Sequence, residues 1–178
     1  MSASVKVPKI EKQKRALSSL RAWGRNYNVG DIGAIYLSIQ RWGFNGALRV
    51  WYDREKPDAE PPVVIAGNHT YLALLQMRDE DCDPPVNVEL DAQGDWLVEC
   101  IDVSHLSFVE AEAFAIADNR TADLATYDEE KLAVLLREIA ERDPEAAKPL
   151  LDSIAGSGQV EVRVVELVPA GKGRPRHA

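Results

Sequence analysis

The spacing of apolar and polar positions predicts a helix, two strands and a second helix in the first half of the chain. Apolar residues at 32, 35, 36, 39 and 42 repeat with helical spacing, between Asp31 as the N-cap and Gly43 as the stop. Residues 47–52 have the composition of a strand. A second strand, Val63–Ala66, meets Gly67, and helical spacing follows at once.

In the second half of the chain, the pattern of apolar and polar positions predicts a hairpin followed by helices. Residues 86–90 and 96–103 have the pattern of two strands around an Asp-Ala-Gln-Gly turn. Ser107 and Glu110 have the spacing of a capping box, which predicts a helix that ends near 118–121. Further along lie a helix opened by Asp128, a short helical turn from Pro144, a linker over 156–158 and a terminal strand over 160–168.

Strands and helices are mixed without strict alternation, so the pattern predicts an α+β fold with a small mixed sheet and flanking helices. A length of 178 residues suits one domain with tails. We expect a basic flexible arm over 1–16 and a domain over 17–140. An extension over 141–170, with a short helix and a strand, and a basic disordered tail over 171–178 would follow.

Charge divides the chain more sharply than its net value of −8 suggests. Residues 1–25 carry +6 and residues 171–178 carry +3, which leaves −17 on the middle. An acidic body is repelled by nucleic acid, whereas the basic ends can hold it or simply be solvated. No apolar run is long enough to span a membrane, and no secretory signal is present. With two cysteines that lack metal-ligand spacing, we expect a cytoplasmic protein with reduced thiols.

Gly67-Asn68-His69-Thr70 is the first candidate site, because it joins a strand to the start of a helix. The first N–H groups of a helix lack intrahelical partners and lie at the positive end of its dipole, so they can bind a phosphate. Gly67 permits close approach, and His69 can donate a hydrogen bond to a phosphate oxygen. The alternative is an ordinary helix cap formed by Asn68 or Thr70.

A second polar cluster, Asp118-Asn119-Arg120-Thr121, ends a very apolar helical segment. Asp118 and Asn119 offer oxygen ligands of the kind that Mg²⁺ prefers, and Arg120 can pair with a phosphate. The alternative is a helix C-terminus with Asn119 in a left-handed conformation. A third candidate is the loop with Arg25 and Asn26, where an arginine can clamp a phosphate or stack on a base.

The order of these motifs is more specific than any one of them. The Arg25-Asn26 loop, then Val64-Ile65-Ala66-Gly67-Asn68-His69-Thr70, then Ala117-Asp118-Asn119-Arg120-Thr121 together resemble the ParB/sulfiredoxin superfamily, and most closely its small phage-type ParB-like nuclease domain proteins. The resemblance covers roughly residues 17–140. It implies phosphate binding by Gly67 to Thr70 and by Arg25, Asn26, Asn119, Arg120 and Thr121, and a cation at Asp118 and Asn119.

The chain departs from two branches of that superfamily at the turn. Partition ParB proteins carry Gly-Glu-Arg-Arg and sulfiredoxins carry Gly-Cys-His-Arg, where this chain has Gly-Asn-His-Thr. Without the thiol, sulfinic-acid reduction is excluded. After residue 140 the chain is too short for the DNA-reading and dimerisation domains of a partition ParB.

Three functions therefore remain as expectations. The first is a DNA-transaction protein that binds nucleotide or nucleic-acid phosphate and hydrolyses a phosphodiester or a nucleoside triphosphate, with His69 and Asp118 as catalytic residues, Mg²⁺ as cofactor, and ATP or CTP as nucleotide. The second is a non-catalytic module that binds DNA or a protein. The third is a small-molecule kinase. Oligomerisation through exposed aromatic residues stays open.

Overall fold

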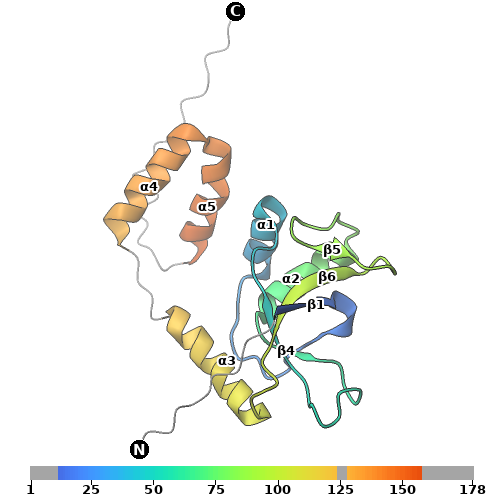
Figure 1. The fold of residues 1–178 in the computed structure, drawn as a ribbon. Helices are drawn as coiled ribbons and strands as arrows, with labels where there is room; N and C mark the ends of the chain where they lie inside the picture. The colour runs from blue at the N-terminus through green and yellow to red at the C-terminus, as the bar shows by residue number, and fades with distance from the viewer. Residues whose placement is uncertain (1–11, 124–127, 158–178) are drawn as a thin grey trace, which may run out of the picture. The chain divides into compact units, whose positions relative to one another are not determined.

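A computed structural model of the chain describes residues 12–123 and 128–157, apart from the side chains of residues 120–123, 129, 149 and 152–157. Contacts divide the chain into two compact units, Met1–Ala122 and Asp123–Ala178, which are described separately. The first unit contains a mixed sheet with three helices, and the second contains a pair of helices (Figure 1). None of the helices in the described ranges is both long and apolar enough to cross a membrane.

The sheet confirms the predicted α+β class. Its strand order is β1-β6-β3-β4-β2, and β5 pairs with β6 on the side opposite β1, since Leu97 pairs with both Ala16 and Glu89. Neighbours alternate between antiparallel and parallel pairing across this order, with β1–β6 and β3–β4 antiparallel and β6–β3 and β4–β2 parallel. The strands are β1 (Lys12–Ala16), β2 (Arg21–Ala22), β3 (Leu48–Trp51), β4 (Val63–Ala66), β5 (Glu89–Leu90) and β6 (Trp96–Asp102), with a 3₁₀ turn at Leu17–Ser19.

Helix starts follow the predicted capping signals. Asp31 accepts a hydrogen bond from the Ala34 N–H at 2.9 Å, and Asp128 accepts one from the Lys131 N–H at 3.1 Å. The Ser107 N–H and hydroxyl both donate to the Glu110 carboxylate at 2.8 Å, which confirms the capping box. The helices are α1 (Ile32–Trp42), α2 (Asn68–Asp79), α3 (Phe108–Asp123), α4 (Glu129–Arg142) and α5 (Pro144–Ser157).

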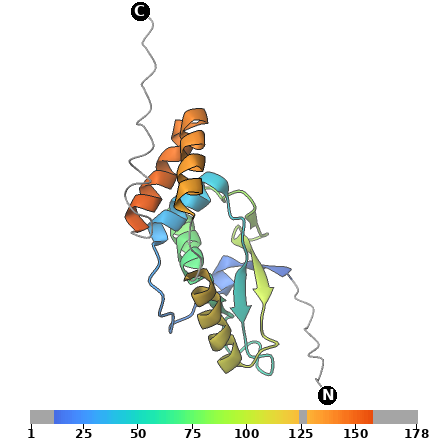
Figure 2. The same ribbon diagram turned by 90° about the vertical axis from the view of Figure 1, so that its left-hand side faces the viewer.

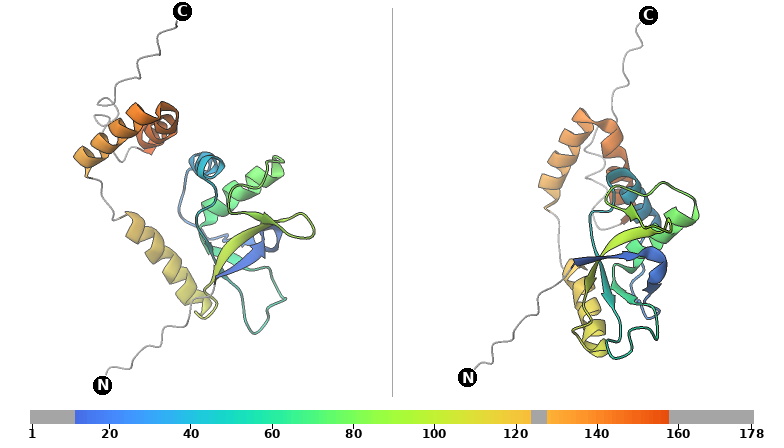
Figure 3. Two further views of the ribbon diagram at one scale, coloured as in Figure 1. Left: turned by 45° about the horizontal axis from the view of Figure 1, so that its top comes forward. Right: turned by 45° about the vertical axis from the view of Figure 1, so that its right-hand side comes forward.

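Helices cover both faces of the sheet, which explains the uninterrupted apolar run of β4. On one face, α1 and α2 pack on Val64 together with core residues of β3 and β6. On the other face, α3 packs on Val63 and Ile65 through Ala111 and Ala115. Figure 3 shows α1 and α2 together on one side of the sheet and α3 on the other. All four residues of β4 are buried as a result, as expected for a strand enclosed on both sides.

The N-terminal boundary differs from the prediction. We expected a flexible arm over 1–16, but Lys12–Ala16 forms β1 and pairs with β6 in the register Lys12↔Ile101 to Ala16↔Leu97. Three cations of the expected arm, Lys12, Lys14 and Arg15, are therefore fixed on the sheet. Residues 1–11 lie outside the described part of the chain.

The C-terminal predictions also need correction. The compact unit ends at residue 122 rather than 140, since α4 packs against α5 through Ala133, Leu136 and neighbouring leucines. The short helical turn expected at Pro144 is a 14-residue helix that runs through the expected linker at Gly156 and Ser157. Likewise, α3 continues to Asp123, so residues 118–121 lie within a helix rather than at its end. The strand expected over 160–168 and the tail over 171–178 lie outside the described residues.

Gly43 is required both by its backbone conformation and by its packing. Its φ is 80°, and a Cβ there would lie 2.7 Å from both the Cβ and the carbonyl oxygen of Val86. We expect Gly43→Ala to lower the free energy of unfolding by about 3 kcal/mol in urea titrations, from left-handed strain plus the clash. Gly94→Ala is the matched control, because Gly94 has a φ of 84° with no atom within 4 Å of its Cβ position. It should cost about 1 kcal/mol, and equal losses would contradict the packing argument.

Candidate functional site

The turn between β4 and α2 leaves the start of the helix without a side-chain cap. Gly67 is the N-cap residue and has the left-handed backbone angles φ 89° and ψ 25°. A Cβ at Gly67 would lie 3.1 Å from the Leu48 Cδ2 atom, so glycine suits this position for its packing as well as its conformation. The first N–H groups of α2 therefore face outward without competition from a capping oxygen.

A small hollow of about 130 Å³ lies at this helix start. Four parts of the first unit line it: the loop after β2, α1 through Ile35, the segment from Ile65 to Thr70, and α3. None of the lining residues is acidic, although the chain has a net charge of −8. The lining polar groups are amides, a hydroxyl and an imidazole beside the positive end of a helix dipole, a combination that favours an anion. The lining residues are Asn26, Asn28, Ile35, Ile65, Ala66, Gly67, Asn68, His69, Thr70 and Asn119.

Three of the lining side chains are available to a ligand. Among the described residues, no hydrogen-bond partner is found for the Thr70 hydroxyl or for the side-chain amides of Asn28 and Asn119. Thr70 is in the first turn of α2, Asn28 is in the loop, and Asn119 is on α3. Hydrogen-bonding groups from three separate elements therefore converge on one small volume.

His69 links the loop to α2. Its Nε2 atom accepts a hydrogen bond from the Gly30 N–H at 3.0 Å. The imidazole lies so close to Gly30 that a Cβ at Gly30 would be 2.6 Å from Nδ1. With Nε2 used as an acceptor, the neutral ring carries its proton on Nδ1, which is then its only donor. In this arrangement the histidine positions the loop that forms one wall of the hollow.

Asn68 lines the hollow, but its side chain serves the protein interior. The residue is 6% exposed. Its Oδ1 atom accepts a hydrogen bond from the Trp23 N–H at 2.8 Å, and its Nδ2 atom donates to the Val64 carbonyl at 2.9 Å. Asn68 therefore joins the segment after β2 to β4, and its backbone N–H in the first turn of α2 is a further donor toward an anion.

The loop residues predicted for phosphate binding divide between the hollow and the surface. Asn26 lines the hollow, and its Oδ1 atom accepts from the Asn28 N–H at 3.3 Å, which folds the loop on itself. Arg25 is absent from the lining, and its guanidinium donates to Glu112 of α3 at 2.7 Å. The arginine side chain is 75% exposed, so this ion pair is a surface contact between the loop and α3.

Of the two residues on α3 that were predicted to bind a cation, Asp118 and Asn119, only one lines the hollow. Asn119 lines the hollow, whereas Asp118 is exposed and absent from the lining, as expected from the rotation of about 100° between successive helical residues. The side chains of Arg120 and Thr121 lie outside those described. No group of three His, Cys, Asp or Glu side chains that could hold a metal ion is found within residues 12–123 and 128–157. Metal binding by Asp118 and Asn119 thus stays a prediction that would need oxygen atoms from a ligand.

Sequence reasoning missed three residues of this region. Ile35 forms part of the wall of the hollow, the Gly30 N–H donates to His69, and Glu112 pairs with Arg25. The Gly30-His69 and Arg25-Glu112 contacts span 39 and 87 residues, and no local signal marks them.

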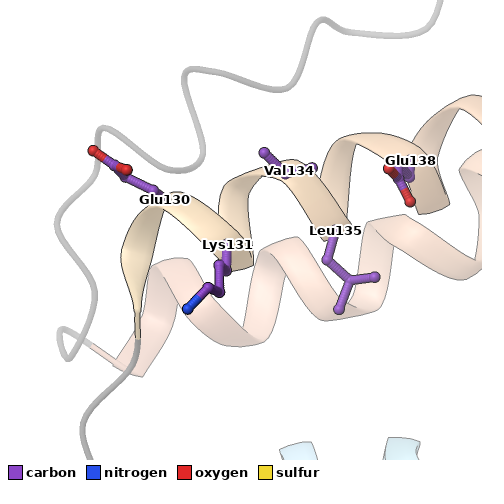
Figure 4. Close-up of a pocket in the computed structure, with 5 residues that line it drawn as sticks. All are labelled: Glu130, Lys131, Val134, Leu135 and Glu138. Atoms are coloured by element: carbon purple, nitrogen blue, oxygen red, sulfur yellow. The ribbon is translucent and has the colours of Figure 1, made fainter.

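A different hollow lies on α4 alone and is lined by Glu130, Lys131, Val134, Leu135 and Glu138. Figure 4 shows these side chains arranged along a single helix, without the converging polar groups of the α2 hollow.

No protein-family model matches this sequence, and no curated protein sequence matches it. Among solved structures, the chain is similar to the C-terminally truncated chromosome-partitioning protein ParB from Caulobacter crescentus, which was crystallised as a complex with CTP-γ-S. The TM-score is 0.55 and the sequence identity is 12%, over 87% of this chain and 74% of the ParB chain. The chain therefore has an α+β fold similar to that of ParB.

Proposed function

We propose that this protein binds a phosphate group of a nucleotide in the hollow at the start of α2 and acts in DNA transactions. The observation that carries the proposal is the lining of that hollow, in which uncapped helix N–H groups, free amides and a hydroxyl converge without any acidic side chain. The fold shared with a chromosome-partitioning protein solved with a CTP analogue supports a nucleotide as the ligand. A volume of about 130 Å³ suits phosphate groups, with the sugar and the base outside.

Binding without hydrolysis is the form of this function that the side chains favour. The Nε2 atom of His69 is occupied by the Gly30 N–H, and Asp118 is outside the lining of the hollow. In this arrangement neither residue is a general base for water beside a bound phosphate, while the Nδ1–H of His69 is left as a donor to a phosphoryl oxygen, the role expected for it. Nucleoside triphosphate hydrolysis or DNA cleavage with Mg²⁺ at Asp118 and Asn119 is the alternative, and it requires a rearrangement of these groups on ligand binding.

A ligand screen tests the proposal. Thermal shift and calorimetry with CTP, ATP, the corresponding monophosphates and pyrophosphate, each with and without Mg²⁺, should show stabilisation by the phosphate-rich ligands. The expected gain is about 2.7 kcal/mol at a ligand concentration 100 times the dissociation constant. Absence of stabilisation by every one of these ligands would refute nucleotide binding. Release of inorganic phosphate or cleavage of labelled DNA in the same samples would establish the hydrolytic alternative.

A further inference from the structure

A second and larger hollow lies elsewhere on the first unit, with a volume of about 470 Å³. It forms where the end of β3, the loop over 52–62, the start of β2 and the first turn of α3 meet. Figures 1 and 2 both show this loop beside the start of α3. The volume is within the range of small-molecule sites and is large enough for a base with its sugar. None of its lining residues belongs to the hollow at α2, so the two sites are separate.

Aromatic side chains form much of its wall, and contacts within the protein fix their positions. The Trp51 Nε1–H donates to the Leu106 carbonyl at 3.0 Å, and the rings of Trp51 and Phe108 lie with centroids 4.7 Å apart at 54°. The Tyr52 hydroxyl donates to Asp102 at 3.3 Å. Phe108 is 36% exposed, so part of its ring is free to contact a ligand. Three aromatic residues are thus held in place around a cavity that a planar group can enter.

The Asp102 carboxylate, which accepts the hydrogen bond of Tyr52, stays charged near neutral pH. Burial alone would raise the pKa of Asp102, but hydrogen bonds from Ser104 and the charge of Arg54 hold that pKa below its usual value. The Ser104 N–H donates to Asp102 at 2.7 Å, and Arg54 pairs with it at 3.2 Å. Asp102 therefore remains an acceptor for Tyr52, and the position of the tyrosine is maintained over the pH range of a binding assay.

Cations border the aromatic wall. Lys56 lines the hollow, and its ammonium group has no ion pair with any residue in the described ranges. Arg21 also lines it and pairs with Glu60, whose side chain is 72% exposed, so a phosphate can compete for the guanidinium. The guanidinium of Arg15 lies over the Tyr52 ring at 5.2 Å, which adds positive charge beside the hollow. A free lysine and partly paired arginines beside aromatic rings are features of surfaces that bind nucleic-acid strands without sequence preference.

We propose that this hollow binds a nucleobase together with its adjoining phosphate, with the base against Phe108 and Trp51 and the phosphate at Lys56 and Arg21. Stacking is tolerant of base identity, because every base has a π-face. The carboxylate oxygen of Asp53 that is not bonded to the Glu55 N–H is an acceptor for an N–H group of a base, such as the N3–H of thymine. The ligand is a free nucleotide or one residue of a single strand, which share this chemistry. A duplex is excluded, since its bases are stacked inside.

Fluorescence anisotropy with a short fluorescein-labelled oligothymidylate tests the site. Phe108→Leu retains apolar volume but removes the ring, and Lys56→Gln removes the free charge. We expect each change to weaken binding about 10-fold, and only Lys56→Gln to reduce the salt dependence. Trp42→Ala and Lys148→Gln are the matched controls, an exposed aromatic residue on α1 and an exposed lysine on α5, and each should change affinity less than about 2-fold.

Further arms of the experiment identify the ligand source and the outcomes that overturn the proposal. Thymidine monophosphate that displaces the oligonucleotide would indicate a free nucleotide, and displacement by unlabelled oligonucleotide alone would indicate a strand. Both results support the site. Equal affinity for a duplex of the same length, or no detectable binding at low salt, overturns it. Unchanged affinity in both Phe108→Leu and Lys56→Gln, with circular dichroism showing intact folds, does so as well.

Discussion

The substitution Asn119→Asp is expected to weaken nucleotide binding about 10- to 100-fold, because it places a carboxylate in the hollow at α2. The Asn119 amide lines that hollow without a partner among the described residues. Two like charges about 5 Å apart repel by roughly 3 kcal/mol at an effective dielectric constant near 20, and solvent exposure at the open rim reduces this value. A loss of about 1.4 kcal/mol already corresponds to a factor of 10.

The neighbouring residue provides the matched control. Asp118→Asn changes the same charge in the opposite direction one position earlier in α3, on a residue that is exposed and outside the hollow. Its effect on the dissociation constant from calorimetry should stay within about 2-fold, with or without Mg²⁺. If Asp118 holds a cation with the bound nucleotide, Asp118→Asn will instead weaken binding only when Mg²⁺ is present. Equal affinities of Asn119→Asp and the unaltered protein would contradict the placement of the phosphate.

The second large effect concerns stability rather than binding. Asn68→Ala leaves two backbone groups of the interior, the Trp23 N–H and the Val64 carbonyl, without partners. Each unsatisfied buried group costs about 1–3 kcal/mol, so we expect a total loss of about 3 kcal/mol in the free energy of unfolding. Urea and thermal unfolding measure it, with Asn45→Ala as the control. The Asn45 side chain donates to the Trp42 carbonyl, but the residue is exposed, so water can replace that bond at a cost below about 1 kcal/mol.

Asn68→Asp gives an independent check through pH. An aspartate at this position can still accept from the Trp23 N–H, but it can donate to the Val64 carbonyl only when it is protonated. Burial and this donor role should raise its pKa in the folded state above the unfolded value near 3.9. The folded state then binds more protons, so the stability of the variant relative to the unaltered protein should be highest below pH 4 and fall as pH rises through the folded pKa. A relative stability that rises with pH over that interval would contradict the two hydrogen bonds assigned to Asn68.

Local features of the fold could be predicted, because their signals are short. The strand Val63–Ala66, the turn at Gly67, the N-caps Asp31 and Asp128 and the capping box at Ser107 each depend on residues within about four positions of one another. β1 was missed because its pairing partner β6 is more than 80 residues away, and its sequence, Lys-Gln-Lys-Arg-Ala, has the composition of a solvated arm.

The candidate site was predicted at the level of segments and only partly at the level of side chains. The loop with Asn26, the turn at Gly67 and Asn119 do meet at one hollow. Tertiary geometry decides which residue of each motif lines the hollow. Asn119 lines it and Asp118 does not, and Arg25 forms an ion pair with Glu112 instead. The orientation of Asn68 toward the interior likewise follows from the approach of Trp23, which is 45 residues away.

The pairing of β1 with β6 bears on how the protein should be shortened for experiments. A chain that begins at Leu17 would lose β1 and leave the N–H and C=O groups of residues 97–101 without a neighbouring strand on that side. An exposed strand of this kind recruits strands from other molecules, so such a truncation should aggregate or exchange strands between copies. A role of the basic N-terminal residues in nucleic-acid binding is therefore better tested by neutralising Lys6 and Lys9 in the chain of 178 residues than by deletion.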